Sequence, residues 1–229
     1  MGIIAGIMTG EGFIPLIPVW FYLLSSMAYG IAALISFLVS YYSYKIFSTD
    51  KRLKSNLFLA LGFLGLGIAF SVLTFTSVYT YLHDPFLKGF LSLNIVNVKI
   101  FNLYYAISLV SYILLNIAYL PKRFVSRLKI LPVLFVPLWY INFDNFHIIS
   151  IILLAIINFR TIRNFLKQKS LNSFLVMSCF LTMIAFHALI FSLSFDITLY
   201  ILAHLISIAG FVSLLIALIR VNRDVKEKK

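Results

Sequence analysis

Two histidines, His187 and His204, lie within apolar stretches of the C-terminal third of the chain, with Asp196 between them. If Asp196 marks a turn between two helices, the rise of about 1.5 Å per residue places both imidazoles at a similar depth on consecutive helices. An ionisable residue inside an apolar helix usually faces the interior of a bundle, where it is a functional candidate. The pair is therefore the first place to look for chemistry.

Three kinds of chemistry fit His187 and His204. They could form a hydrogen-bonded structural pair, or a ligand-sensing or proton-responsive pair, because imidazole changes its charge near physiological pH. They could also be the two axial ligands of a haem b. Zinc needs three or four ligands and only two are visible, so no metal site is predicted.

Tyrosines add polar groups to the same picture. Tyr105, Tyr112 and Tyr119 recur every seven residues and so share one helix face, which should look inward, either as polar glue between helices or as the wall of a ligand cavity. Tyr200, His204 and Ser207 share a face at i, i+4 and i+7. The predicted cavity is lined by Tyr105, Tyr112, His187, Tyr200, His204 and Ser207.

Catalytic groups are sparse in this sequence. The single cysteine, Cys179, lies inside an apolar run, and no serine or cysteine nucleophile with an oriented base can be identified. No carboxylate lies deep in a well-defined apolar span, which disfavours a carboxylate-based proton pump. The sequence thus favours a non-enzymatic protein. The seven acids are Glu11, Asp50, Asp84, Asp144, Asp196, Asp224 and Glu227.

Composition identifies the elements that carry these residues. The 229 residues are 62% hydrophobic and 11% charged, whereas soluble domains are about 25% charged. Apolar runs of about 20 residues, enough to cross a bilayer as helix, recur along the chain. We predict an all-α polytopic membrane protein with seven transmembrane helices, near residues 18–44, 56–81, 98–120, 129–144, 144–160, 171–194 and 197–219.

The fourth and fifth runs are the shortest of the seven. At about 1.5 Å per residue each spans less than the hydrocarbon core, and Pro132 and Pro137 interrupt the fourth. The alternative is five spans plus a re-entrant hairpin with Asp144 and His147 at its tip.

Basic residues indicate the orientation. Of the 19 Lys and Arg residues, 17 lie in clusters around Lys51, Arg123 and Lys167 and in the tail after Arg220, all on one side of the predicted spans. The positive-inside rule then places the N-terminus outside and the C-terminus in the cytoplasm of a multi-pass cell-membrane protein. The same clustering explains the net charge of +12 without nucleic-acid binding.

A possible internal repeat lies within what we treat as a single transmembrane domain of residues 1–229. A shift of 116 positions gives nine identities over residues 51–75, including Asn56 with Asn172 and Phe70 with Phe186. A real repeat would relate spans 1–3 to spans 5–7 in parallel around span 4, as in some transporters.

Seven spans with an external N-terminus resemble the layout of microbial rhodopsins, but the resemblance is one of topology alone. The last predicted span, residues 197–219, contains no lysine that could hold retinal. A shared topology does not specify a function.

The leading functional hypothesis is a sensor-like or accessory subunit of a membrane complex. Its loops are too short for an output domain, so a signal would pass to another membrane or cytoplasmic protein on the basic face, which should also attract anionic lipid headgroups. The alternatives are a small-solute transporter of the 3+1+3 helix type and a haem b redox subunit.

Overall fold

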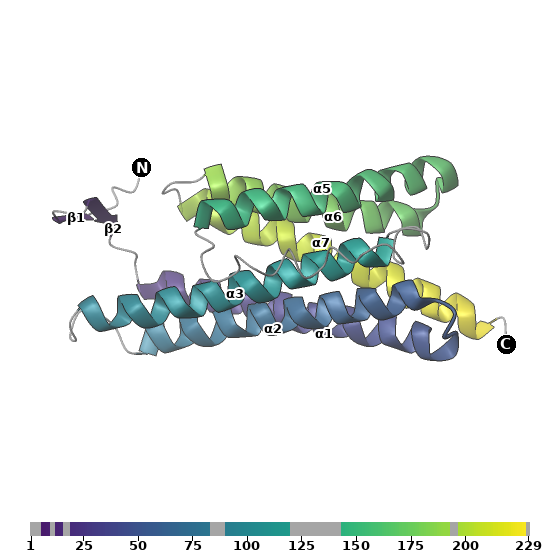
Figure 1. Cartoon of the computed structure of the whole chain (residues 1–229), viewed down its shortest axis with the longest axis horizontal. Helices are drawn as coiled ribbons and strands as arrows, with labels where there is room; N and C mark the ends of the chain where they lie inside the picture. The colour runs from purple at the N-terminus through teal and green to yellow at the C-terminus, as the bar shows by residue number, and fades with distance from the viewer. Residues whose placement is uncertain are drawn as a thin grey trace, which may run out of the picture.

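The computed structural model describes most of the chain as an elongated bundle of helices preceded by a small hairpin (Figure 1). The predicted fourth span lies outside the described residues. Those described are 6–9, 12–15, 19–82, 90–119, 143–192 and 197–227.

Six long helices dominate the structure, as the all-α prediction required. The hairpin was not predicted: two four-residue strands pair antiparallel, with Gly6 opposite Pro15 and Thr9 opposite Gly12. The elements are β1 (Gly6–Thr9), β2 (Gly12–Pro15), α1 (Val19–Thr49), α2 (Lys54–Leu82), α3 (Phe90–Tyr119), α5 (Phe143–Gln168), α6 (Leu171–Ser192) and α7 (Ile197–Glu227).

All six helices are long and apolar enough to cross a membrane, which confirms a polytopic helical membrane protein. Their outward faces carry large apolar side chains, such as Phe75 at 75% exposed and Phe159 at 71%. Ser40 and Ser111 are instead buried, and their hydroxyls donate to the backbone carbonyls of Ala60 and Ile107. This distribution suits a lipid environment, in which polar groups must find partners inside the protein.

Helix α5 overturns the re-entrant alternative for its part of the chain. Asp144 lies in the first turn of one continuous helix, and His147 is a buried residue of that helix, so the chain after Asp144 is one long helix and not the short arm of a hairpin. The helix also continues past Arg160 to Gln168. A helix need not end where its apolar run ends, because long basic side chains can extend along it toward water. Its 26 residues span about 39 Å, more than a hydrocarbon core.

The helices form two three-helix units that pack in chain order. Helix α2 packs against α1 and α3, and α6 packs against α5 and α7. The units meet where α1 contacts α7 and where α3 contacts α5. Helices α3 and α5 run in the same direction, so Tyr119 and Phe143 lie at opposite ends of the bundle (Figure 1).

One end of the bundle gathers the turn between α1 and α2, the turn between α5 and α6, and the end of α7 (Figure 1). We call it the basic end, because Lys51, Arg52, Lys167, Lys169 and Arg223 lie there. The helices α3, α5 and α7 begin at the opposite end.

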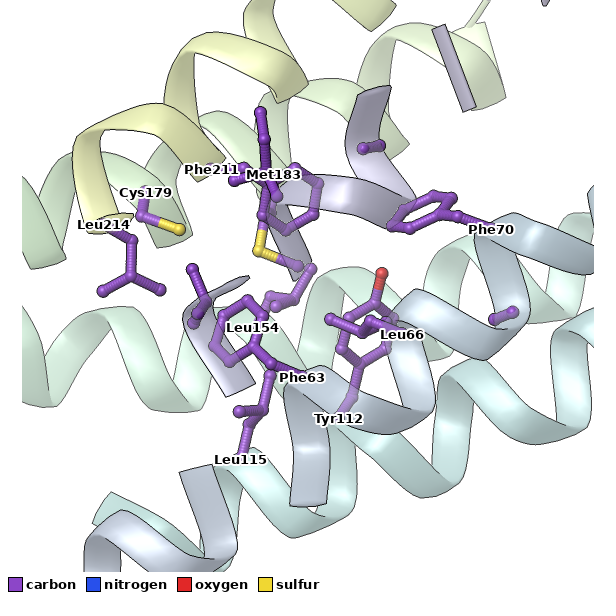
Figure 2. Close-up of a cluster of buried hydrophobic side chains, with 14 of the residues drawn as sticks. Phe63, Leu66, Phe70, Tyr112, Leu115, Leu154, Cys179, Met183, Phe211 and Leu214 are labelled. Atoms are coloured by element: carbon purple, nitrogen blue, oxygen red, sulfur yellow. The ribbon is translucent and has the colours of Figure 1, made fainter. Parts of the chain in front are cut away.

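The core of the bundle is filled by side chains from all six described helices, and Figure 2 shows part of it. Phe211 of α7 lies edge-on to Phe63 and Phe70 of α2, with ring centroids 6.2 and 5.7 Å apart. In lipid such contacts stabilise the bundle by dispersion and close fit rather than by removal from water. The labelled residues are Phe63, Leu66, Phe70, Tyr112, Leu115, Leu154, Cys179, Met183, Phe211 and Leu214.

Glycine and single polar groups bring neighbouring helices close together. A Cβ added at Gly210 of α7 would overlap the Thr182 side chain of α6 and lie 3.2 Å from the Cys179 carbonyl oxygen. Hydroxyl and amide groups then bond across the interfaces. Ser40 Oγ donates to the Ala60 carbonyl at 2.8 Å, Ser213 Oγ to that of Leu175 at 3.0 Å, and Asn116 Nδ2 to that of Leu153 at 3.0 Å.

Candidate functional site

A chain of three hydrogen-bonding side chains crosses the interior between α3, α6 and α5. His187 of α6 is fully buried, and its Nε2 lies 2.8 Å from the Tyr112 hydroxyl of α3. Its Nδ1 lies 2.9 Å from Nδ1 of His147 on α5. Both ring nitrogens of His187 are therefore bonded. We call Tyr112, His187 and His147 the histidine chain.

Aromatic rings surround the histidine chain. Phe146 is fully buried beside it, with its centroid 5.0 Å from that of His147 and 5.5 Å from that of His187. The ring of Tyr105 stacks on Phe146 with centroids 4.3 Å apart. These rings surround the two hydrogen bonds of the histidine chain with apolar groups, which makes each bond costly to lose.

The predicted pairing of His187 with His204 is wrong as a direct contact. The Phe186 ring lies edge-on to both imidazoles, with its centroid 5.2 Å from that of His187 and 5.3 Å from that of His204. Successive residues of a helix point about 100° apart, so Phe186 faces α7 while His187 turns toward α3 and α5. The partner of His187 is His147, which the sequence placed in the proposed hairpin tip.

His204 instead belongs to a second group of polar side chains between α7 and α1. Its Nδ1 donates to the Tyr200 carbonyl oxygen at 2.9 Å, and its Nε2, buried, has no hydrogen-bond partner among the described residues. The Tyr200 hydroxyl lies 2.6 Å from that of Tyr29 on α1. The Tyr29 ring also meets His204 edge-on at 5.0 Å.

The two groups share a cavity of about 300 Å³ at the end of the bundle opposite the basic end. All six helices contribute to it, and seven of its ten lining residues are Phe or Tyr. Within the described ranges, the only other polar side chain of the lining is an imidazole, and no lining group carries a carboxylate or a lysine or arginine cation. The lining residues are Tyr29, Leu73, Phe101, Tyr104, Tyr105, Phe143, His147, Phe186, Ile190 and Tyr200. We call this space the aromatic cavity.

The predicted site residues fall at different distances from the aromatic cavity. Tyr105 and Tyr200 line it. Tyr112 and His187 connect to it through His147, and His204 packs against Tyr200 at 4.2 Å between ring centroids. Ser207 is buried but does not line the cavity.

The sequence missed Tyr29 and His147 as members of this site. Tyr29 lies in a run rich in aromatic and small residues, where nothing distinguishes an inward hydroxyl from an interfacial one. His147 carried a usable signal, because it lies three residues after Asp144 at the start of an apolar run. A continuous helix through that run would have buried it.

The sequence predicts no metal site and gives haem ligation by two histidines as an alternative. Among the described residues, no group of three or more His, Cys, Asp and Glu side chains could hold a metal ion. Haem ligation by His187 and His204 stays a prediction, and it would require His187 Nε2 to leave Tyr112 or Nδ1 to leave His147. An absorption spectrum of the purified protein tests it.

A second cavity of about 360 Å³ lies at the basic end. Hydroxyl and amide side chains of α3, α5 and α6 and of the turn before α6 make up most of its wall, and α7 adds apolar ones. Its lining residues are Tyr119, Thr161, Asn164, Gln168, Ser170, Asn172, Ser173, Val176, Ala217, Leu218 and Val221. We call it the polar cavity.

Comparison with known proteins gives no family for this chain. No protein-family model, no curated protein and no solved structure matches it significantly.

Proposed function

We propose that this chain is a non-enzymatic heptahelical membrane protein that binds a small molecule in the aromatic cavity and acts as a sensor-like or accessory subunit of a membrane complex. The observation that carries the proposal is that a cavity wall residue, His147, is also the end of a buried hydrogen-bond chain. A cavity of about 300 Å³ is at the lower end of the size range of small-molecule sites.

The histidine chain supplies a route from ligand to protein. A ligand that bonds to His147 changes the bonding available to His187 and, through it, to Tyr112, which packs among the central core residues. Binding energy can shift a conformational equilibrium only through such differential contacts. The response would leave the membrane at the basic end, where a partner protein and anionic lipid headgroups bind.

Seven spans, an external N-terminus and a cytoplasmic C-terminus complete the proposal. The count of seven spans is supported by the direction of α3 and α5, which run the same way. Because α3 ends at one end of the bundle and α5 begins at the other, the chain has to cross the length of the bundle once more between them. The clustering of Lys51, Lys167 and Arg223 at one end supports the orientation. A location in the cell membrane is part of the same proposal.

Blocking the cavity tests ligand binding directly. Ile190 lines the aromatic cavity, so Ile190→Trp should fill it. Leu181 lies on the same helix and is 52% exposed on the outside of the bundle, so Leu181→Trp is the matched control. Wild-type protein and the control should copurify with the same small molecule, detected by mass spectrometry, and Ile190→Trp should lose it.

A binding role fails if all three proteins carry the same small molecules in the same amounts while Ile190→Trp is folded. Folding is checked by circular dichroism and by gel filtration in detergent. A sensor or subunit role also requires a partner, so crosslinking in native membranes should capture a second protein at Lys51→Cys or Lys167→Cys. Absence of any crosslinked partner counts against the subunit role and leaves the binding role standing.

A small-solute transporter is the second candidate, favoured by the arrangement of the helices. Exchanging α1, α2 and α3 for α5, α6 and α7 preserves every helix contact described above, as a parallel repeat would. The aromatic and polar cavities lie toward opposite ends of the bundle, with the central core between them. Uptake into liposomes that depends on Tyr112 or His204 would support transport, and a broad screen without uptake would oppose it.

A further inference from the structure

The directions of the hydrogen bonds in the histidine chain define what the aromatic cavity offers a ligand. The Tyr112 hydroxyl has His187 Nε2 as its hydrogen-bond partner and no other among the described residues. If Nε2 carried the proton, the phenol hydrogen would be left unpaired in the core, which is unfavourable. Tyr112 therefore donates, and His187 Nε2 accepts.

The proton of His187 is then on Nδ1. A neutral imidazole carries one N–H, and a second would place an unpaired positive charge in the interior. Nδ1 of His187 therefore donates to Nδ1 of His147, 2.9 Å away. Because that nitrogen accepts, His147 carries its own proton on Nε2.

His147 thus brings a hydrogen-bond donor to the cavity wall. Its Nε2 has no hydrogen-bond partner in the part of the chain that the structure describes, and the residue lines the aromatic cavity. That donor is open to the cavity, so an occupant that supplies an acceptor gains a hydrogen bond that an occupant without one cannot make.

The remaining wall defines the shape and charge of the occupant. Phe101, Phe143 and Phe186 and four tyrosine rings present flat apolar faces and edges, which pack best against another flat conjugated system. Among the described residues, the wall holds no carboxylate and no lysine or arginine. An uncharged occupant avoids the cost of placing an unpaired charge there.

We propose that the aromatic cavity binds an uncharged, planar, conjugated carbonyl compound, a quinone or a close analogue, whose carbonyl oxygen accepts a hydrogen bond from Nε2 of His147. The proposal rests on the proposed function, since it requires the cavity to bind a ligand at all. It involves binding alone and no electron transfer.

Three probes separate the possible occupants of the cavity. 2,3-Dimethyl-1,4-naphthoquinone carries the carbonyls, 2,3-dimethylnaphthalene has the same fused rings without them, and benzyltrimethylammonium is an aromatic cation. Equilibrium binding is measured on the full-length protein in lipid nanodiscs, and binding to the Ile190→Trp variant is subtracted to remove partition into lipid. The quinone should bind about tenfold more tightly than the hydrocarbon.

Two variants assign that preference to the histidine chain. His147→Phe should bring the quinone and the hydrocarbon to equal affinity, because the donor is gone and the apolar wall remains. Tyr112→Phe lies outside the cavity wall and should reduce the preference in part, because His187 Nε2 is then free to carry the proton and the tautomer of His147 is no longer fixed. Leu181→Trp should retain the full preference.

The outcomes distinguish this proposal from the proposed function. Equal affinity of the quinone and the hydrocarbon for the wild-type protein overturns the carbonyl assignment while showing that the cavity binds ligands. Tighter binding of benzyltrimethylammonium overturns it in favour of an aromatic cage for cations. No difference between wild-type protein and Ile190→Trp for any probe overturns both proposals.

Discussion

Nδ1 of His147 and Nδ1 of His187 lie 2.9 Å apart on neighbouring helices, so one of these nitrogens carries a hydrogen and donates the bond, and the other accepts the bond. The Tyr112 hydroxyl at the far side of His187 breaks the symmetry of the pair. A phenol on α3 thereby determines which nitrogen of an imidazole on α5 is a donor, although Tyr112 and His147 do not bond to each other.

The tautomers of the buried histidines are the first prediction. His187 should carry its proton on Nδ1 and His147 on Nε2, for the reasons given above. His204 should carry its proton on Nδ1, because its partner is a carbonyl oxygen, which can only accept. Nitrogen-15 spectra of histidine-labelled protein distinguish protonated from unprotonated ring nitrogens, with each His→Phe variant assigning one residue. A protonated Nε2 on His187 contradicts the inferred direction of the chain.

Removal of the Tyr112 hydroxyl should destabilise the protein. Tyr112→Phe leaves His187 Nε2 as a buried acceptor without a partner, which should cost about 1 kcal/mol of unfolding free energy. Tyr119→Phe, seven residues further along the same helix, is the control, because no hydrogen bond of the Tyr119 hydroxyl is found within the described residues. Unfolding in mixed micelles measures both variants. Equal stability of the two would mean that the Tyr112–His187 bond contributes nothing.

Close approach of α6 and α7 at Gly210 gives a second stability prediction. Gly210→Ala adds a Cβ that overlaps Thr182 and crowds the Cys179 carbonyl, so it should destabilise the protein by about 1–3 kcal/mol. Gly30→Ala is the matched change, because the nearest atom to its Cβ is a Thr74 methyl at an ordinary 3.7 Å. That variant should be neutral or up to about 1 kcal/mol more stable, since alanine favours helix. If Gly30→Ala destabilised the protein more than Gly210→Ala, α6 and α7 would have to lie further apart than the structure places them.

Topology is tested by cysteine labelling from outside the cell. Cys179 is fully buried and should not react, so single cysteines at exposed positions report their side of the membrane. Asp144→Cys should be labelled by an impermeant maleimide, while Lys51→Cys and Lys167→Cys should react only after the membrane is opened. Labelling of either lysine position in intact cells contradicts the orientation, and labelling of Lys51→Cys alone would also place α2 and α6 in opposite directions.

Part of the site could be predicted from helix periodicity. Tyr200 and His204 were expected on one face, and the structure keeps them together with ring centroids 4.2 Å apart. Tyr105 and Tyr112 were expected to face inward, and both are buried. These predictions depend on residues within one helix, where 3.6 residues per turn fixes the direction of each side chain.

Partners on different helices could not be predicted in the same way. His187 and His204 were paired because their depths match, yet rotation of α6 about its own axis places Phe186 between them. The alternative prediction placed His147 at a hairpin tip because its apolar run seemed too short to cross the membrane, whereas α5 continues through Arg160 and Arg163. Depth follows from position along a helix, whereas rotation follows from packing against neighbours.

The sequence by itself determined that this chain is a bundle of membrane-spanning helices, because length and apolarity are properties of each segment alone. Only the tertiary structure decided that His147 meets His187, that Tyr29 meets Tyr200, and that the two groups enclose one cavity. Those contacts depend on how each of six similarly apolar helices is rotated about its axis and on which helices it packs against. Close packing of side chains determines both, whereas hydrophobicity alone determines neither.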